Sequence, residues 1–125
     1  MDGYKVTITE SSKELTAKER IALKDTSNAI KLDEVTKPEE PFVFKVSAYA
    51  KIHVDNPNSE DKEYDQYIFV DDDGTKYMTG SVSFFDSFIN IWNEMDGEQE
   101  EWSIEATKHP SKKYNGKFFL TASIV

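Results

Sequence analysis

Residues 42–54 constrain the fold of this chain more than any other segment. Over these thirteen residues, FVFKVSAYAKIHV, apolar and polar side chains alternate with a period of two. One face is purely apolar and carries Phe42, Phe44, Val46, Ala48, Ala50, Ile52 and Val54. Because successive side chains of a strand point to opposite faces, this pattern predicts one long strand with a buried face. The small alanines in its middle indicate strong curvature around a barrel.

Six further segments have the alternation or β-branched content of strands: residues 4–9, 29–35, 64–70, 75–79, 101–109 and 117–125. DDDG, residues 71–74, has the composition of a tight turn between two of these strands. The same residues have the ingredients of a calcium loop, but with Gly74 at loop position six the first ligand would be Phe69. We therefore interpret DDDG as a hairpin turn.

Two helices are expected. Thr16 and Glu19 stand in the capping-box relation, and good helix formers follow as far as Asn28. A second helix is predicted to begin at Ser83, with Asp86 at its third helical position. Its apolar stripe has the spacing of a buried helix face and consists of Phe84, Phe85, Phe88, Ile91, Trp92 and Met95. We interpret this stripe as core rather than as a cofactor site.

The order of these elements predicts the fold class. After the first strand and helix come a strand, the long curved strand, a pair of strands, a helix and two more strands, which is the order of an OB-fold. We therefore expect a mainly β chain: an OB-like five-stranded barrel with a helix between strands 3 and 4. Residues 1–125 are predicted to be a single domain, with the strand and helix of residues 1–27 appended to the barrel. A small α+β sheet with helices on one side is the alternative.

The distribution of charge limits where a nucleic acid could bind. The net charge is −9, which by itself disfavours a phosphate-rich partner. Residues 55–101 hold fourteen acidic and two basic side chains, whereas residues 102–125 hold four basic and one acidic. Salt screens charges over about 8 to 10 Å, so these regions act separately.

The polar face of residues 42–54 is the first candidate binding surface. It carries Lys45, Tyr49, Lys51 and His53, which combine phosphate-neutralising groups with an aromatic ring on which a base can stack. Tyr67 from a neighbouring strand and Phe119 from the last strand are expected to join this surface. The alternative interpretation is an ordinary half-exposed sheet surface.

The second candidate is the loop KHPSKKYNGK, residues 108–117, which contains no acidic residue. Its candidate nucleic-acid-binding residues are Lys108, Lys112, Lys113, Tyr114 and Lys117. In an OB-fold this loop lies between the last two strands and closes over the nucleic acid. A solvated hairpin tip is the alternative interpretation.

Catalysis is not predicted. The only two histidines, His53 and His109, lie in no recognisable nucleophile, metal or phosphate-loop motif. No cysteine is present, so thiolate metal sites, disulfides and cysteine nucleophiles are excluded. We expect no enzyme activity, no metal and no cofactor.

The second half of the chain resembles a known family. YIFVDDDGTKYMTGSVSFFDSFINIW, followed by EEWSIEATKHPSKKYNGKFFLTASIV, is similar to phage-type single-stranded DNA-binding proteins and their relatives on mobile elements of Gram-positive bacteria. The resemblance covers roughly residues 28 to 125. It implies an OB-fold that coats single-stranded DNA during replication or transfer of the element, without sequence preference or catalysis. A cytoplasmic location in a bacterial host cell is expected, because residues 1–15 show no basic start followed by an apolar stretch.

Two other functions stay open from the sequence. An acidic interaction or DNA-mimic domain could act on a host protein through residues 55–73, and a homo-oligomer could form through the exposed ends of the strand at residues 42–54. No membrane partner is expected, because no apolar run is long enough to cross a bilayer.

Overall fold

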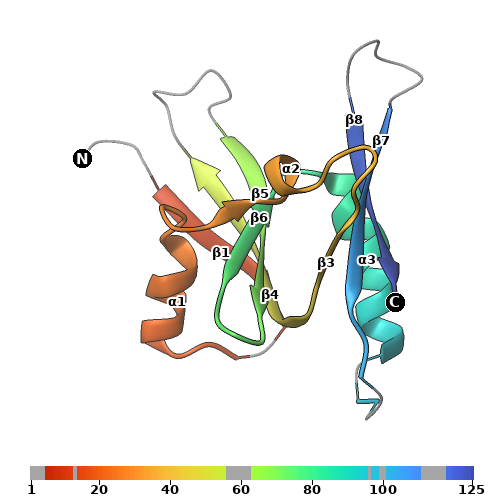
Figure 1. Ribbon diagram of the computed structural model, residues 1–125. Coiled ribbons are helices and arrows are strands. Elements are labelled where there is room, and N and C mark those ends of the chain that lie inside the picture. Colours follow the sequence, from red (N-terminus) through yellow and green to blue (C-terminus); the bar gives the residue numbers. More distant parts are fainter. Residues whose placement is uncertain (1–4, 13, 56–62, 96, 99–100, 111–117) are drawn as a thin grey trace. The chain divides into compact units, whose positions relative to one another are not determined.

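The computed structural model describes residues 5–12, 14–55, 63–95, 97–98, 101–110 and 118–125. Within these residues the fold is mainly β, with eight strands in two sheets and three helices (Figure 1). The chain divides into two compact units. Unit 1 comprises Met1–Ile30 and Ser47–Gly80, and unit 2 comprises Lys31–Val46 and Ser81–Val125. Each unit therefore draws on two separate stretches of the sequence.

The larger sheet has five strands in the order β1-β4-β5-β6-β2. These strands are β1 (Lys5–Ser11), β4 (Val46–Asp55), β5 (Glu63–Asp71), β6 (Lys76–Thr79) and β2 (Ile30–Lys31). β1 runs antiparallel to β4, with Val6 opposite Val54, and the register shifts at a bulge between Ile8 and Glu10. The N-terminal strand is thus an edge strand of this sheet.

One face of this sheet and helix α1 (Ala17–Lys24) form the core of unit 1. α1 begins with the predicted capping box: Thr16 Oγ1 accepts a hydrogen bond from the Glu19 backbone N–H at 3.2 Å, and the Glu19 carboxylate accepts one from the Thr16 N–H at 3.0 Å. The core consists of buried apolar side chains from the helix and the sheet, namely Leu23, Ala50, Ile52, Val54 and Ile68. The apolar alternation of β4 is therefore confirmed as a buried face from residue 50 onward.

The turn between β5 and β6 forms as predicted. The Asp71 N–H donates to the Thr75 carbonyl at 2.8 Å, and the Gly74 N–H donates to the Asp71 carbonyl at 3.0 Å. Gly74 has a φ of +89°, which residues with a side chain rarely adopt. The Asp73 carboxylate accepts a hydrogen bond from the Thr75 N–H at 3.0 Å. DDDG thus serves as a hairpin turn.

Unit 2 contains a three-stranded sheet in the order β3-β7-β8. Its strands are β3 (Phe42–Phe44), β7 (Ile104–Pro110) and β8 (Phe118–Ile124), all antiparallel to their neighbours. The β7–β8 hairpin pairs Ile104 with Ile124 at one end and Pro110 with Phe118 at the other. The last two predicted strands are thereby confirmed.

Helix α3 (Val82–Met95) packs against β8. Phe84, Phe85 and Phe88 of its predicted stripe are buried. The Ser83 hydroxyl donates to the Leu120 carbonyl, and the Ala122 N–H donates to Ser87 Oγ, both at 2.8 Å. β8 ends the sheet, so these hydroxyls satisfy backbone groups that would otherwise lack a strand partner.

Three predictions about local structure are corrected. Residues 29–35 do not form one strand. β2 covers only two of them, and helix α2 (Leu32–Val35) follows directly. The short helix places Leu32 in a fully buried position. α3 begins before Ser83, and the Ser81 hydroxyl accepts the N-terminal hydrogen bond, from the Phe84 N–H at 3.2 Å.

The third correction concerns the long strand at residues 42–54. It is interrupted at Lys45, and its two parts belong to different sheets, β3 in the smaller and β4 in the larger. A period of two holds on both sides of the interruption, so alternation alone could not reveal the change of sheet. Among the described residues the strands form two sheets and no closed barrel, so the OB-like barrel is not confirmed.

Candidate nucleic-acid interface

The polar face of β4 is not a free basic surface. His53 Nδ1 lies 2.9 Å from Asp65 Oδ1, and His53 Nε2 lies 3.2 Å from Glu63 Oε1. Lys51 Nζ lies 3.9 Å from the other oxygen of Asp65. β5 thus sets two carboxylates against the two predicted cationic groups. This arrangement weakens the prediction that Lys51 and His53 contact phosphate, because their charges are already compensated.

The same carboxylates control the protonation of His53. Hydrogen bonds to Asp65 and then Glu63 raise the pKa of His53 above its ordinary value of 6.5. Because the pKa is raised on folding, protonated His53 contributes its full stabilisation below about pH 6.5, and that contribution is lost as pH rises through the higher folded pKa. Above both values His53 contributes nothing through this linkage.

This gives a testable pH dependence. In NMR titrations of a His109→Gln variant, which leaves His53 as the only imidazole, the ring resonances should titrate with a midpoint above 6.5. His53→Gln should remove the loss of stability that the linkage predicts as pH rises above about 6.5. Chemical denaturation of the wild-type protein and of His53→Gln at several pH values measures this pH-dependent loss of stability. A midpoint below 6.5 would contradict the arrangement of the two carboxylates.

The two tyrosines predicted as stacking surfaces are buried. Tyr49 is 7% exposed and Tyr67 is 4% exposed. The Tyr49 hydroxyl donates to Glu10 Oε2 at 3.3 Å, so the ring belongs to the contact between β4 and β1. The sequence suggested exposure because Tyr49 alternates with the apolar face of residues 42–54, and Tyr67 alternates with Gln66 and Ile68. In this conformation neither ring can receive a base, and this part of the predicted surface is corrected.

Lys45 is separated from the other residues of the predicted face. It occupies the position between β3 and β4 and belongs to unit 2, whereas Lys51 and His53 belong to unit 1. Its ammonium group lies 3.5 Å from Glu101 Oε1. The structure therefore does not bring Lys45 together with Lys51 and His53 within one unit.

The end of the β7–β8 hairpin, by contrast, combines exposed aromatic rings with basic side chains. Phe118 is 50% exposed and Phe119 is 41% exposed. Lys108 Nζ lies 5.7 Å from the centroid of the Phe118 ring, a cation–π distance, and also donates to the Asp33 carbonyl at 2.7 Å. Backbone pairing of β7 with β8 places these groups together.

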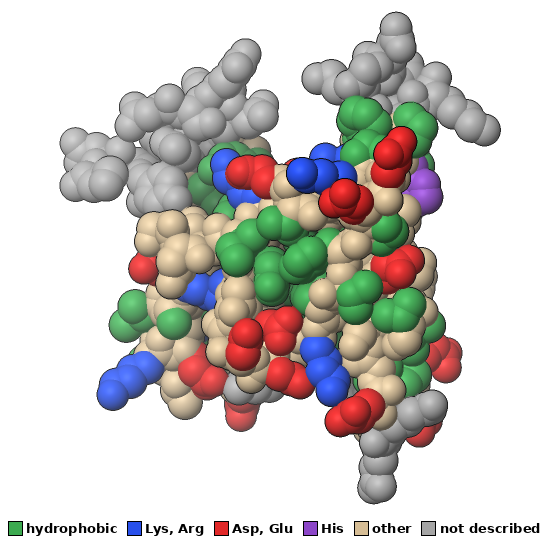
Figure 2. Space-filling view, viewed as in Figure 1, with side chains coloured by type: hydrophobic (Ala, Val, Ile, Leu, Met, Phe, Trp, Pro, Cys, Tyr) green, Lys and Arg blue, Asp and Glu red, His purple; other side chains and the backbone are tan. Residues whose placement is uncertain are grey.

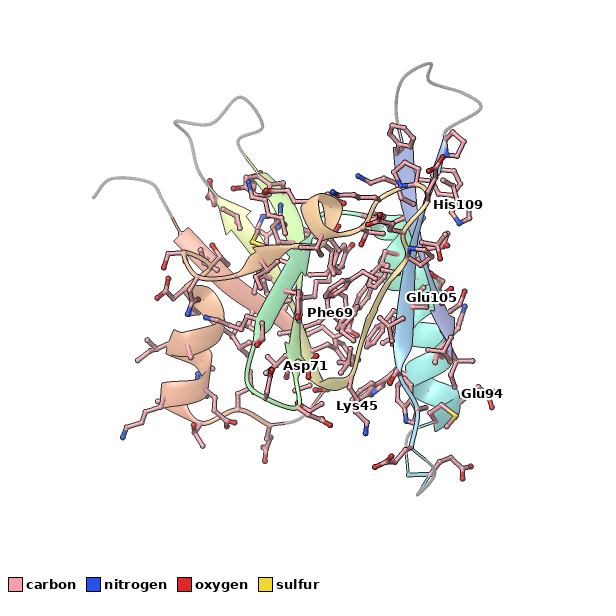
Figure 3. The ribbon with its side chains drawn as sticks, in the orientation of Figure 1. Lys45, Phe69, Asp71, Glu94, Glu105 and His109 are labelled. Atoms are coloured by element: carbon pink, nitrogen blue, oxygen red, sulfur yellow. The ribbon has the colours of Figure 1, made fainter. Side chains whose placement is uncertain are left out.

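The second aromatic ring is held by a histidine. The His109 and Phe119 rings stack with centroids 5.1 Å apart and an angle of 25° between their planes. His109 Nε2 lies 2.9 Å from Thr121 Oγ1, which fixes the imidazole over β8. Figure 3 shows His109 near the end of the hairpin. Since successive strand residues point to opposite faces, Phe118 and Phe119 offer one exposed ring on each face.

The four remaining candidates, Lys112, Lys113, Tyr114 and Lys117, lie outside the described residues. The sequence places all four in the connection between β7 and β8, directly beyond Pro110 and Phe118. Their predicted role stays a prediction.

Sequence reasoning missed Phe118 and His109 as members of this site. The signal available was the adjacency of Phe118 and Phe119 beside the lysine-rich loop. On a strand with one buried face, one of two neighbouring phenylalanines is expected to be buried. Both are exposed here because they stand at the end of the hairpin, Phe119 one residue pair and Phe118 two residue pairs beyond buried Leu120.

The surface charge is mixed. On the face shown in Figure 2, blue lysine and arginine side chains stand apart, and red aspartate and glutamate side chains lie among them. Separately, none of the helices that the structure describes is both long enough and apolar enough to cross a membrane.

Comparison of the chain with protein-family models, curated proteins and solved structures gives no match.

Proposed function

We propose that this protein binds single-stranded DNA without catalysis and without sequence preference, and that the end of the β7–β8 hairpin is its contact site. The observation that carries the proposal is the pair of exposed phenylalanine rings, each accompanied by a basic or imidazole side chain. Aromatic platforms beside cationic groups suit single strands, because every base has a face that can stack.

The chemistry of this end favours unpaired bases over a duplex. Stacking on an aromatic ring requires a base whose face is accessible, which a base inside a duplex lacks. Lys108 and the predicted loop lysines supply the attraction to phosphate.

The acidic composition is compatible with this proposal. Lys108 lies toward the end of the β7–β8 hairpin where Pro110 pairs with Phe118, whereas α3 ends at the opposite end of unit 2 (Figure 1). β7 has seven residues, which span roughly 20 Å at the usual rise of a strand. That exceeds the screening length of about 8 Å at physiological salt. We therefore expect modest affinity that falls as salt is raised.

Replacing Phe119 with alanine tests the proposal. We expect the affinity for a fluorescein-labelled oligothymidine of about 20 nucleotides to fall about 5- to 100-fold, the loss expected for one stacking contact. Fluorescence anisotropy at low salt measures it. Phe119→Leu keeps an apolar side chain but removes the ring, and should lose most of the same affinity.

The matched control is Ile124→Ala, at the other end of the same strand, where the side chain is 46% exposed. It should change the affinity less than about twofold, because it removes no stacking surface. Circular dichroism of each variant checks that the fold is retained. Absence of binding by the wild-type protein at low salt refutes the function. Equal loss of affinity in both variants refutes the hairpin end as the site.

The finer parts of the proposal rest on the resemblance given above. They are an OB-like arrangement of the strands, an origin in a phage or mobile element, and a role in replication or transfer of that element in the bacterial cytoplasm. Simultaneous replacement of Lys112, Lys113 and Tyr114 tests the loop that carries part of the resemblance. Affinity should fall, and the slope of its logarithm against the logarithm of salt concentration should become shallower by about one for each phosphate that the variant no longer neutralises.

One observation favours the alternative of an acidic interaction domain. Glu63 and Asp65 compensate Lys51 and His53 on the polar face of β4 and β5. This face is then better suited to a basic partner protein than to phosphate. Capture from host lysate, repeated with Glu63 and Asp65 changed to glutamine and asparagine, distinguishes the two functions.

A further inference from the structure

Unit 2 contains a small aromatic pocket at the end of α3. It has a volume of about 190 Å³ and is lined by Val46, Trp92, Met95, Gly97 and Trp102. The two indole rings have centroids 6.0 Å apart and planes inclined by 67°, so they form two walls of a corner. All five residues belong to unit 2.

Gly97 lines the pocket with its backbone. It has a φ of +88°, and a Cβ added at this position would meet nothing within 4 Å. The positive φ lets the chain turn at once after α3, and the Glu98 N–H closes the turn by donating to the Met95 carbonyl at 2.9 Å. The corner is therefore bounded by rings on two sides and by a bare backbone on a third.

The described residues next to this pocket in the sequence are acidic. Glu94, Glu98 and Glu101, here called the acidic segment, each adjoin a pocket-lining residue and are exposed. Lys45 and Glu94 both lie toward this end of the unit (Figure 3).

A cation of the protein itself is already attracted to this acidic segment. Lys45 Nζ lies 3.5 Å from Glu101 Oε1, although the Glu101 side chain is 89% exposed. Lys45 adjoins Val46, which lines the pocket. Lys45 balances the charge of Glu101. Among the described residues that adjoin the pocket, the carboxylates of Glu94 and Glu98 therefore give an excess of negative charge.

We propose that this corner, the tryptophan pocket, binds an arginine side chain of a partner protein. Tryptophan is the aromatic side chain that attracts cations most strongly through its ring face. A guanidinium group is planar, so it can stack on an indole while its N–H groups bond carboxylates. Charge complementarity with the acidic segment therefore selects a basic peptide, and the ring geometry selects arginine over lysine.

This site is independent of the hairpin end that is proposed to bind DNA. The two lie at opposite ends of unit 2 (Figure 1). The tryptophan pocket repels phosphate through its acidic segment, whereas the described hairpin end carries the ammonium group of Lys108. A protein with both sites can hold a nucleic acid and a basic partner at the same time.

Intrinsic fluorescence tests the proposal directly, because the only two tryptophans of the chain both line the pocket. The full chain is titrated with the peptide acetyl-Gly-Arg-Gly-Arg-Gly-amide, and with counterparts in which lysine or citrulline replaces arginine. We expect a saturable change of tryptophan emission with the arginine peptide. Citrulline keeps the shape of arginine without the charge, and should bind at least about 10-fold more weakly.

Two variants separate the rings from the carboxylates. Trp102→Leu should lower the affinity about fivefold, with Trp92 still reporting the titration. Glu98→Gln changes one exposed carboxylate, leaves both rings in place, and should lower the affinity about twofold to fivefold. Its matched control is Glu39→Gln, an exposed carboxylate of unit 2 outside the pocket, which should have no effect.

Lys45→Gln gives a change in the opposite direction. Removing this ammonium group releases Glu101 from its ion pair, so the arginine peptide should bind more tightly. Equal affinity for the arginine and citrulline peptides overturns the proposal, as does equal affinity for the arginine and lysine peptides. A response of the tryptophans to oligothymidine but not to any peptide overturns it in favour of a nucleic-acid contact.

Discussion

Replacing Phe88 with alanine is expected to lower the free energy of unfolding of unit 2 by about 3 to 5 kcal/mol. Phe88 is fully buried on α3, and its ring centroid lies 5.7 Å from that of Trp92 and 6.3 Å from that of Phe85. The loss combines the apolar surface of the ring with the cavity left among these aromatic neighbours.

Urea denaturation followed by tryptophan fluorescence measures this effect, since Trp92 and Trp102 both belong to unit 2. Asn90→Ala is the control on the same helix: its side chain is exposed, and the change should stay within about 0.5 kcal/mol. A loss below about 1 kcal/mol for Phe88→Ala would falsify the assignment of this helix face to the core. α3 also packs on β8, the strand that carries the proposed DNA contact. The DNA affinity of Phe88→Ala should therefore be measured under conditions in which the variant is still folded.

Replacing Ile52 with alanine should destabilise unit 1 by about 2 to 5 kcal/mol. Ile52 is fully buried in the middle of β4 and belongs to the core that α1 and the sheet share. Neighbouring β1 places Ile8 opposite it across the antiparallel ladder. Shortening the side chain removes apolar contacts from both layers of this core at once.

Unit 1 contains no tryptophan, so hydrogen exchange of peptides that cover β4 and β5 is the suitable measurement. Protection should fall throughout these strands in Ile52→Ala. The neighbouring Lys51→Ala variant serves as control, because Lys51 is half-buried on the opposite face and forms one ion pair of 3.9 Å. It should cost less than about 1 kcal/mol. Equal effects of the two changes would contradict the assignment of faces on β4.

The two proposals for unit 2 share a physical basis in the separation of charge along the sequence. Residues 102–125 are basic in excess, and residues 94–101 immediately before them are acidic. The β7–β8 hairpin carries the basic part away from the acidic part along β7. A molecule of net charge −9 can therefore present one end to phosphate and another to a guanidinium group.

The candidate site was predictable only in part. The lysine-rich loop and Phe119 could be recognised because a charge pattern and an alternating strand are local properties of the sequence. The burial of Tyr49 and Tyr67 could not be foreseen, because it depends on which strands and side chains cover each ring. The carboxylates that face His53 come from β5, and only strand pairing brings Asp65 within 2.9 Å of the imidazole.

The amino-acid sequence by itself determined the elements that depend on neighbours within a few residues. These are the capping box at Thr16, the turn at Gly74, the buried stripe of α3 and the alternation of β4, because caps, turns and periodicity are short-range effects. Only the tertiary structure decided that residues 42–54 divide at Lys45 between two sheets and that two exposed rings meet basic groups at the hairpin end. Strand pairing and burial join residues far apart in the chain, and a local pattern cannot specify its partner.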